Sequence, residues 1–175
     1  MSEGIGARVL RKEDKRFITG KGRYTDDIVE PNQAYAAFVR SPHAHARIVS
    51  IDTSAAMAMA GVETVLMGAE LVSDGIGNII CGWGVTSKDG SPMNMGAWSA
   101  LATEKVRYVG DAVAIVVADT KSLATLAAEA VVVTYEELPV VVGSLQALAG
   151  GAPQLHENAP GNLIFDWEIG DLAPT

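Results

Sequence analysis

A repeated pattern of strand, Asp-Thr pair, alanine-rich helix and strand constrains the fold of this chain most. It occurs at residues 45–67, around Asp52-Thr53, and again at residues 112–135, around Asp119-Thr120. In each copy a side-chain oxygen of the pair can cap the helix by accepting a hydrogen bond from a free backbone N–H. Two right-handed crossovers of this kind predict an α+β domain with two βαβ-like units and a mixed sheet. The alternative is that a common helix-capping pattern occurs twice in this chain by chance.

The hydrophobic pattern predicts further elements. Ala112–Ala118 is apolar throughout, which is typical of a strand buried on both faces. In the helix expected over residues 121–130, one face is predicted to carry Leu123, Leu126, Ala127 and Ala130. Other strands are expected at 33–40, 45–51, 62–67, 105–108 and 131–135, with room for a short one at 76–81, and short helices at 54–60 and 144–149.

The length of 175 residues suits one domain with flanking segments. We predict a basic, turn-rich N-terminal arm at 1–33, a domain at 34–151 and an extended C-terminal tail at 152–175. Residues 68–104 are the least regular part of the domain and contain seven glycines. A loop excursion of that length is usually functional or forms an interface.

The net charge of −8 argues against nucleic acid and anionic membranes as partners. Residues 1–47 carry nine basic and six acidic residues, a net of +3, so the remainder carries −11. A basic arm on an acidic body suggests docking onto that body or onto a partner, and a solvated surface segment is the alternative.

A cytoplasmic location is expected from three features. No apolar run approaches the ~18 residues of a membrane span, and the first residues lack the pattern of a secretory signal. Cys81 is the single cysteine, which excludes an internal disulfide and a cysteine-ligated iron–sulfur cluster within this chain. We expect Cys81 to be a small buried hydrophobic residue.

His43 and His45 form the one closely spaced histidine pair. On a strand, residues i and i+2 share a face, so both rings could approach one metal ion. A metal site needs three or four ligands, however, and Pro42 places His43 in a turn. Histidines that form hydrogen bonds or lie in an interface are therefore the better interpretation.

Other candidate motifs also favour structural roles. Thr19–Arg23 lacks the spacing of a phosphate-binding loop and is predicted to be a turn. Asp26-Asp27 and Glu136-Glu137 are adjacent carboxylates, which on a strand point to opposite faces and form no acid–base pair. The residues by themselves predict a soluble α+β domain without an assembled catalytic site.

Several sequence blocks in one order carry a family resemblance. The most specific is Ser41-Pro42-His43-Ala44-His45-Ala46-Arg47-Ile48 with 50–53, and the others are 6–16, 19–28, 105–119, 133–139, 155–156, 162–163 and 168–171. Together they resemble the α/β-hammerhead domain at the N-terminus of the molybdopterin-binding large subunit in the xanthine dehydrogenase, aldehyde oxidase and carbon monoxide dehydrogenase family. Lys15 and Ala112 depart from the family, whose members often have proline there.

The resemblance implies a hammerhead fold for residues 34–151 and a structural role in an enzyme that hydroxylates an aldehyde, an N-heterocycle or carbon monoxide with oxygen from water. It implies that the parent enzyme uses molybdopterin cytosine dinucleotide, iron–sulfur clusters and FAD. In the family, the molybdopterin loops and the base-acting glutamate follow this domain. No catalytic, cofactor-binding or metal-binding residue is therefore expected in this chain, which we predict to be inactive by itself.

The expected partners are the remaining molybdopterin-binding domains, the iron–sulfur subunit and, as a further candidate, the flavoprotein subunit. Five residues are predicted to lie in an interface: Arg23, Tyr24, Arg40, His43 and His45. The reason is that their motif is polar and aromatic, whereas a core strand would be apolar. A free-standing assembly or binding module that serves such an enzyme is one alternative. A small metal- or flavin-using enzyme on a borrowed fold is another, since fold does not imply function.

Overall fold

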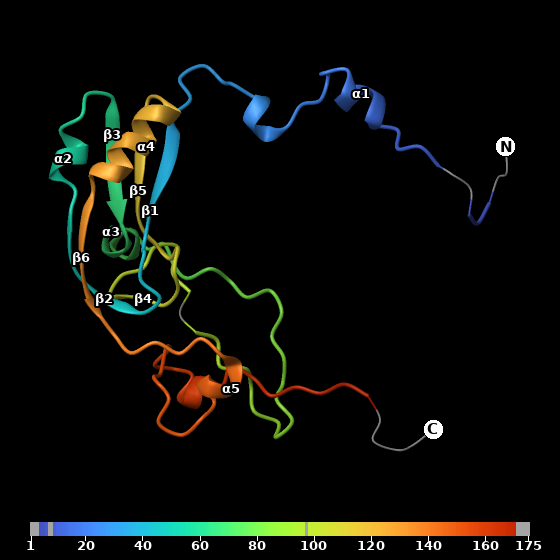
Figure 1. Cartoon of the computed structure of the whole chain (residues 1–175), viewed down its shortest axis with the longest axis vertical. Coiled ribbons are helices and arrows are strands. Elements are labelled where there is room, and N and C mark those ends of the chain that lie inside the picture. The colour runs from blue at the N-terminus through green and yellow to red at the C-terminus, as the bar shows by residue number, and fades with distance from the viewer. Residues whose placement is uncertain (1–3, 7–8, 97, 171–175) are drawn as a thin grey trace. The chain divides into compact units, whose positions relative to one another are not determined.

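The structure is a computed structural model that describes residues 4–6, 9–96 and 98–170 (Figure 1). The chain divides into two compact units, residues 1–33 and residues 34–175. The first unit contains helix α1 (Asp14–Ile18) and the 3-10 helix η1 (Thr25–Asp27). Helix α1 lies in the arm that the sequence predicted to be turn-rich, and no helix was predicted there.

Within its described residues, the second unit contains two antiparallel sheets of three strands each. The first sheet has the order β1-β5-β3, and the second has the order β4-β2-β6. The strand bounds are β1 (Tyr35–Arg40), β2 (Ala46–Asp52), β3 (Val62–Met67), β4 (Lys105–Val106), β5 (Ala112–Ala118) and β6 (Val132–Glu137).

The predicted α+β class is confirmed, but the predicted mixed sheet is wrong, since every strand pair is antiparallel. Both strand–helix–strand units are present. Each helix, however, connects strands of different sheets: α2 (Ser54–Met57) leads from β2 to β3, and α4 (Lys121–Ala130) leads from β5 to β6. The crossover therefore joins the two sheets instead of placing parallel strands within one.

The Asp-Thr pairs act at the helix starts as predicted. Thr120 Oγ1 accepts a hydrogen bond from the Leu123 backbone N–H at 3.2 Å and caps α4. At α2 the Asp52 carboxylate accepts from the Ser54 backbone N–H at 2.9 Å. Gly61, which follows α2, has φ +89°, a left-handed conformation that favours glycine.

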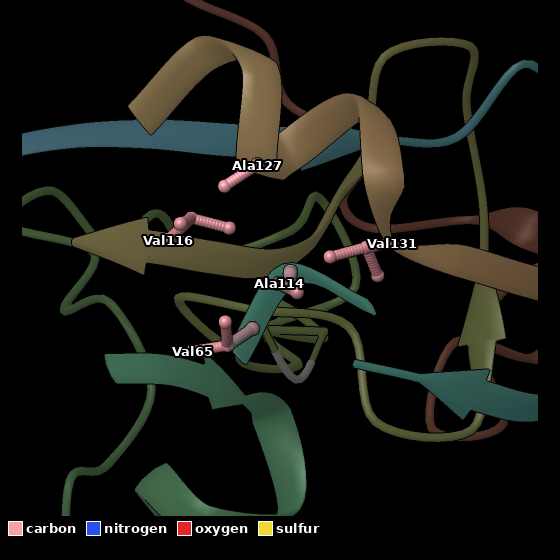
Figure 2. Close-up of a cluster of buried hydrophobic side chains, with 6 residues drawn as sticks. Val65, Ala114, Val116, Ala127 and Val131 are labelled. Atoms are coloured by element: carbon pink, nitrogen blue, oxygen red, sulfur yellow. The ribbon is translucent and has the colours of Figure 1, made fainter. Parts of the chain in front are cut away.

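Helix α4 packs on one face of the β1-β5-β3 sheet through small side chains. Figure 2 shows Ala127 on the side of the helix that faces Val116 of β5, and both residues are fully buried. The predicted helix face is partly wrong, because Ala124 is buried whereas Leu126 is 56% exposed. A helix that lies this close to a sheet has room for alanine but not for leucine along its line of contact. The core cluster comprises Ala56, Val65, Ala114, Val116, Ala127 and Val131.

Residues 68–104 differ from the prediction in two respects. Residues 76–81 form no strand. Helix α3 (Gly68–Ser73) was not predicted; its Glu70 carboxylate accepts from the Met67 backbone N–H at 2.7 Å. Two short helices, α5 (Ser144–Ala147) and η2 (Pro160–Asn162), follow β6. In the described part of the chain, no helix has the length and apolar character needed to cross a bilayer.

Candidate functional site

The turn between β1 and β2 contains the histidine pair and is fastened to two distant segments. Ser41 is buried, and its backbone N–H donates to the Asp111 carbonyl oxygen at 2.8 Å. His45 is 5% exposed, and its Nδ1 lies 2.8 Å from the Pro139 carbonyl oxygen. The Leu138 backbone N–H donates to the His45 carbonyl oxygen at 3.0 Å. His45 thus joins this turn to the end of β6.

His43 contacts other residues than His45 does, so the two imidazoles diverge. His43 Nδ1 lies 3.5 Å from a carboxylate oxygen of Glu137, and its ring centroid lies 4.8 Å from that of Tyr135. Burial raises the pKa of the Tyr135 phenol. Among the described residues, no group of three or more His, Cys, Asp and Glu side chains could hold a metal ion. The geometry gives the His45 side chain a hydrogen-bonding role and places the His43 ring against Glu137 and Tyr135.

The other predicted interface residues fall in both units. Arg40 is exposed; its guanidinium donates to the Gly110 carbonyl oxygen at 2.9 Å and lies 5.2 Å from the Phe38 ring centroid. Arg23 and Tyr24 belong to the first unit and are exposed. The Tyr24 ring stacks on Phe17 at a centroid distance of 5.5 Å. Arg40, His43 and His45 therefore share the β1–β2 region, whereas Arg23 and Tyr24 belong to the arm.

Sequence reasoning missed a polar cluster around Arg107. The Arg107 guanidinium donates to the Leu155 carbonyl oxygen at 2.8 Å and to the Glu157 carboxylate at 3.2 Å. The Lys105 ammonium donates to the same carboxylate, and this bond, with the positive charges of Lys105 and Arg107, lowers the pKa of Glu157 to about 2. Burial, followed by the charge of Arg107, lowers the pKa of His156. About fifty residues separate the partners, so no local sequence signal indicates the cluster.

A small pocket adjoins this cluster. It has a volume of about 40 Å³ and is lined by Trp98, Ser99, Ala102, Arg107, Tyr108, Asp111 and His156. That volume accommodates water molecules, whereas small-molecule and cofactor sites typically measure roughly 300–1,000 Å³. An open groove on α4 is larger but is lined by side chains of that one helix. Neither feature fits a dinucleotide cofactor.

The prediction that Cys81 is buried is wrong. The side chain is exposed, and Sγ lies 3.1 Å from the Trp83 carbonyl oxygen. The surrounding loop contributes exposed apolar side chains, namely Ile76, Ile79, Ile80, Trp83, Met95 and Trp98. None of these six residues belongs to either core cluster of the described residues, and each is at least half exposed.

Comparison with known proteins finds relatives of the same kind, since the two described here are both large chains or large subunits. The large chain of carbon monoxide dehydrogenase from Hydrogenophaga pseudoflava is 40% identical over 193 aligned positions, which cover 98% of this chain and 22% of that protein. The nicotine 6-hydroxylase large subunit of Paenarthrobacter nicotinovorans is 40% identical, over 91% of this chain and 19% of its own length. This chain thus spans about a fifth of the curated relatives that it matches.

Solved structures agree with the sequence relatives. A Cu,Mo-CO dehydrogenase has a TM-score of 0.72 at 41% identity, over 89% of this chain and 18% of that chain. Quinoline 2-oxidoreductase from Pseudomonas putida 86 has a TM-score of 0.70 at 43% identity, over 85% of this chain and 18% of its own. The family described as aldehyde oxidase and xanthine dehydrogenase, a/b hammerhead domain, matches residues 19–139. The chain belongs to this family, and the predicted hammerhead fold is confirmed.

Proposed function

We propose that this chain is the hammerhead part of the molybdenum-binding large subunit of a hydroxylase-type oxidoreductase, where it acts as a scaffold. The proposal rests on one observation: the alignment covers a large share of this chain but a small share of its relative. Nearly the whole chain aligns with a carbon monoxide dehydrogenase large chain, of which it spans 22%. The reacting groups of such an enzyme would then lie in the other four-fifths.

The site geometry supports a scaffold role. His45 Nδ1 and the Arg107 guanidinium each fasten distant segments of the chain to each other. The described residues offer neither a metal-ligand cluster nor a pocket of cofactor size near the polar groups. The molybdopterin cytosine dinucleotide of the proposed parent enzyme does not fit these residues, and we derive no catalytic step from them.

The proposal extends to the assembled enzyme. The parent enzyme would use molybdopterin cytosine dinucleotide, iron–sulfur clusters and FAD, and would hydroxylate an aldehyde, an N-heterocycle or carbon monoxide. This chain would pack against the remaining molybdopterin-binding domains and the iron–sulfur subunit, with the flavoprotein subunit as a further candidate. Arg23, Tyr24, Arg40, His43 and His45 would lie in these interfaces, and the assembly would be cytoplasmic.

Co-expression with a deleted relative tests the proposal. The probe is the Hydrogenophaga pseudoflava large chain without the region that aligns with this chain. We expect the two polypeptides to co-purify, and we expect the 175-residue chain by itself to retain no molybdenum and to oxidise no substrate. Turnover by the chain with stoichiometric molybdenum would contradict the proposal.

The complete large chain of the same relative is the matched control, because its own hammerhead domain should occupy the site. A scaffold that belongs to the subunit should bind the deleted large chain and not the complete one. Equal binding to both would instead favour the free-standing assembly module.

A further inference from the structure

Among the described residues of the second unit, no layer covers one face of the β1-β5-β3 sheet. In antiparallel strands, residues directly opposite each other project to the same side. Phe38 lies opposite Ile115, which lies opposite Leu66; Ala36 lies opposite Val117, which lies opposite Thr64. We call these six residues the outer sheet face. Helix α4 packs on the other face, where Ala114 and Val116 are fully buried (Figure 2).

The outer sheet face is apolar and accessible. Phe38 is 47% exposed, Ala36 is exposed, and the four residues of β3 and β5 are partly exposed. None of the six side chains is charged, and Thr64 is the polar member of the set. A continuously apolar strand such as β5 is typical of sheets that are covered on both sides. The sequence of β5 therefore calls for a second layer opposite α4.

We propose that the outer sheet face docks an apolar element of the molybdenum-binding domains of the same large subunit. The inference rests on the proposed function and specifies which surface of the scaffold carries the contact. The relatives supply the occupant, since about four-fifths of their length lies outside the aligned region. Permanent interfaces are more apolar than transient ones, which fits contact with an element of the same polypeptide.

The size of the face argues against a second copy of this chain. Three strands about 4.8 Å apart, with residues about 3.4 Å apart along each strand, give a patch of roughly 200 Å². A stable interface between separate proteins buries about 800 Å² on each partner. An element in the same polypeptide needs less area, because the covalent link supplies a high effective concentration.

Cysteine labelling tests the surface directly. In a Cys81→Ser background, Ala36→Cys places a thiol on the outer sheet face, and Ala114→Cys places the matched thiol on the α4 face of the same sheet. Maleimide reaction rates are compared in the 175-residue chain and in a chimera in which this chain replaces the aligned region of the Hydrogenophaga pseudoflava large chain. Phe38→Cys repeats the measurement at a second position of the face.

We expect Ala36→Cys to react at the rate of an exposed thiol in the chain and at least 100-fold more slowly in the chimera. Ala114→Cys should be unreactive in both proteins. The inference would be overturned if Ala36→Cys and Phe38→Cys each reacted as fast in the chimera as in the 175-residue chain. It would also be overturned if these thiols became less reactive in the 175-residue chain as the concentration of that chain rises. If the chain co-purifies with the deleted large chain while both thiols stay reactive in the chimera, the surface assignment fails and the proposed function stands.

Discussion

Arg107 shows how one side chain fixes the path of a segment far away in sequence. Its guanidinium bonds a backbone carbonyl of residue 155 and a carboxylate of residue 157, while its own backbone N–H donates to Asp111 at 3.0 Å. The guanidinium suits this role because its donors are held in a rigid planar fork. The segment after α5 is thereby held beside β4.

The ion pairs of Glu157 should stabilise the fold at neutral pH. Its folded pKa of about 2 lies below the ordinary 4.5, so the stabilisation is present above about pH 4.5 and is lost as the pH falls towards 2. The side chain is 67% exposed, so solvent screens the interaction. We expect Glu157→Gln to lower the free energy of unfolding by about 1 kcal/mol at neutral pH, as measured by urea denaturation.

The pH dependence separates this effect from a general loss of stability. The difference between Glu157→Gln and the unaltered chain should shrink as the pH falls from 4.5 towards 2. Glu129→Gln is the matched control, because Glu129 is exposed on α4 and forms no ion pair with any described residue. A pH-independent difference at Glu157 would contradict the ionic interpretation.

Gly68 is required by close packing at the start of α3. A Cβ atom there would lie 2.6 Å from the Ala102 carbonyl oxygen and 2.9 Å from that of Leu101. Because both atoms belong to the backbone, Gly68→Ala should lower the free energy of unfolding by about 1–3 kcal/mol. Thermal and urea denaturation measure the change. Gly77→Ala, where a Cβ meets no atom within 4 Å, should shift stability far less, and equal losses would contradict this explanation.

The sequence predicted hydrogen-bonding or interface roles for the two histidines, but it could not identify their partners. Pro42 and the absence of a third nearby ligand already argued against a metal site. The partner of His45 is the carbonyl of Pro139, 94 residues away, and a contact at that separation depends on the path of the whole chain. The exposure of Cys81 was mispredicted for the same reason, because burial depends on what packs over a loop.

Helix α4 shows which properties of an element are local. Its bounds and its cap at Thr120 follow from nearby residues, and the structure has both as predicted. Which face of α4 is buried does not follow from nearby residues. Two rows of side chains overlap on the helix surface, one with Leu123 and Leu126 and the other with Ala124 and Ala127. The Ala114 and Val116 side chains of β5 allow a close approach, which places alanine at the contact and leaves Leu126 exposed.

The cap of α4 gives a prediction at the scale of the element. Thr120→Ala removes the acceptor of the Leu123 N–H and should lower the free energy of unfolding by about 1 kcal/mol. Thr125→Ala is the matched control on the same helix. The Thr125 hydroxyl donates to the Lys121 carbonyl oxygen at 3.1 Å, which already accepts within the helix, so its loss should cost less than about 0.5 kcal/mol. Urea denaturation compares the two variants, and equal losses would contradict the capping role.

At the scale of the molecule, the order of strands β1 to β6 and of helices α2, α4 and α5 was predictable, whereas the partition of the strands into sheets was not. The strand–helix–strand units are where the pattern placed them. A connecting helix, however, does not determine which sheet the next strand joins. Nor does it determine whether that strand runs parallel or antiparallel to its neighbours. Here both connections cross from one sheet to the other, which requires long-range pairings such as β1 with β5 that local periodicity does not indicate.

The three tryptophans report on the whole molecule, because each has a large exposed fraction: 66% for Trp83, 58% for Trp98 and 44% for Trp167. In the chain labelled with 5-fluorotryptophan, all three ¹⁹F resonances should therefore show a solvent isotope shift between H₂O and D₂O. Trp83 and Trp167 pack edge to face at a centroid distance of 5.8 Å, and exposed aromatic pairs are typical of interface centres. Binding of the unlabelled, deleted large chain should remove the isotope shift of this pair. Tryptophan-to-phenylalanine variants assign the resonances, and a bound complex in which all three keep their full shift would place the partner elsewhere on the surface.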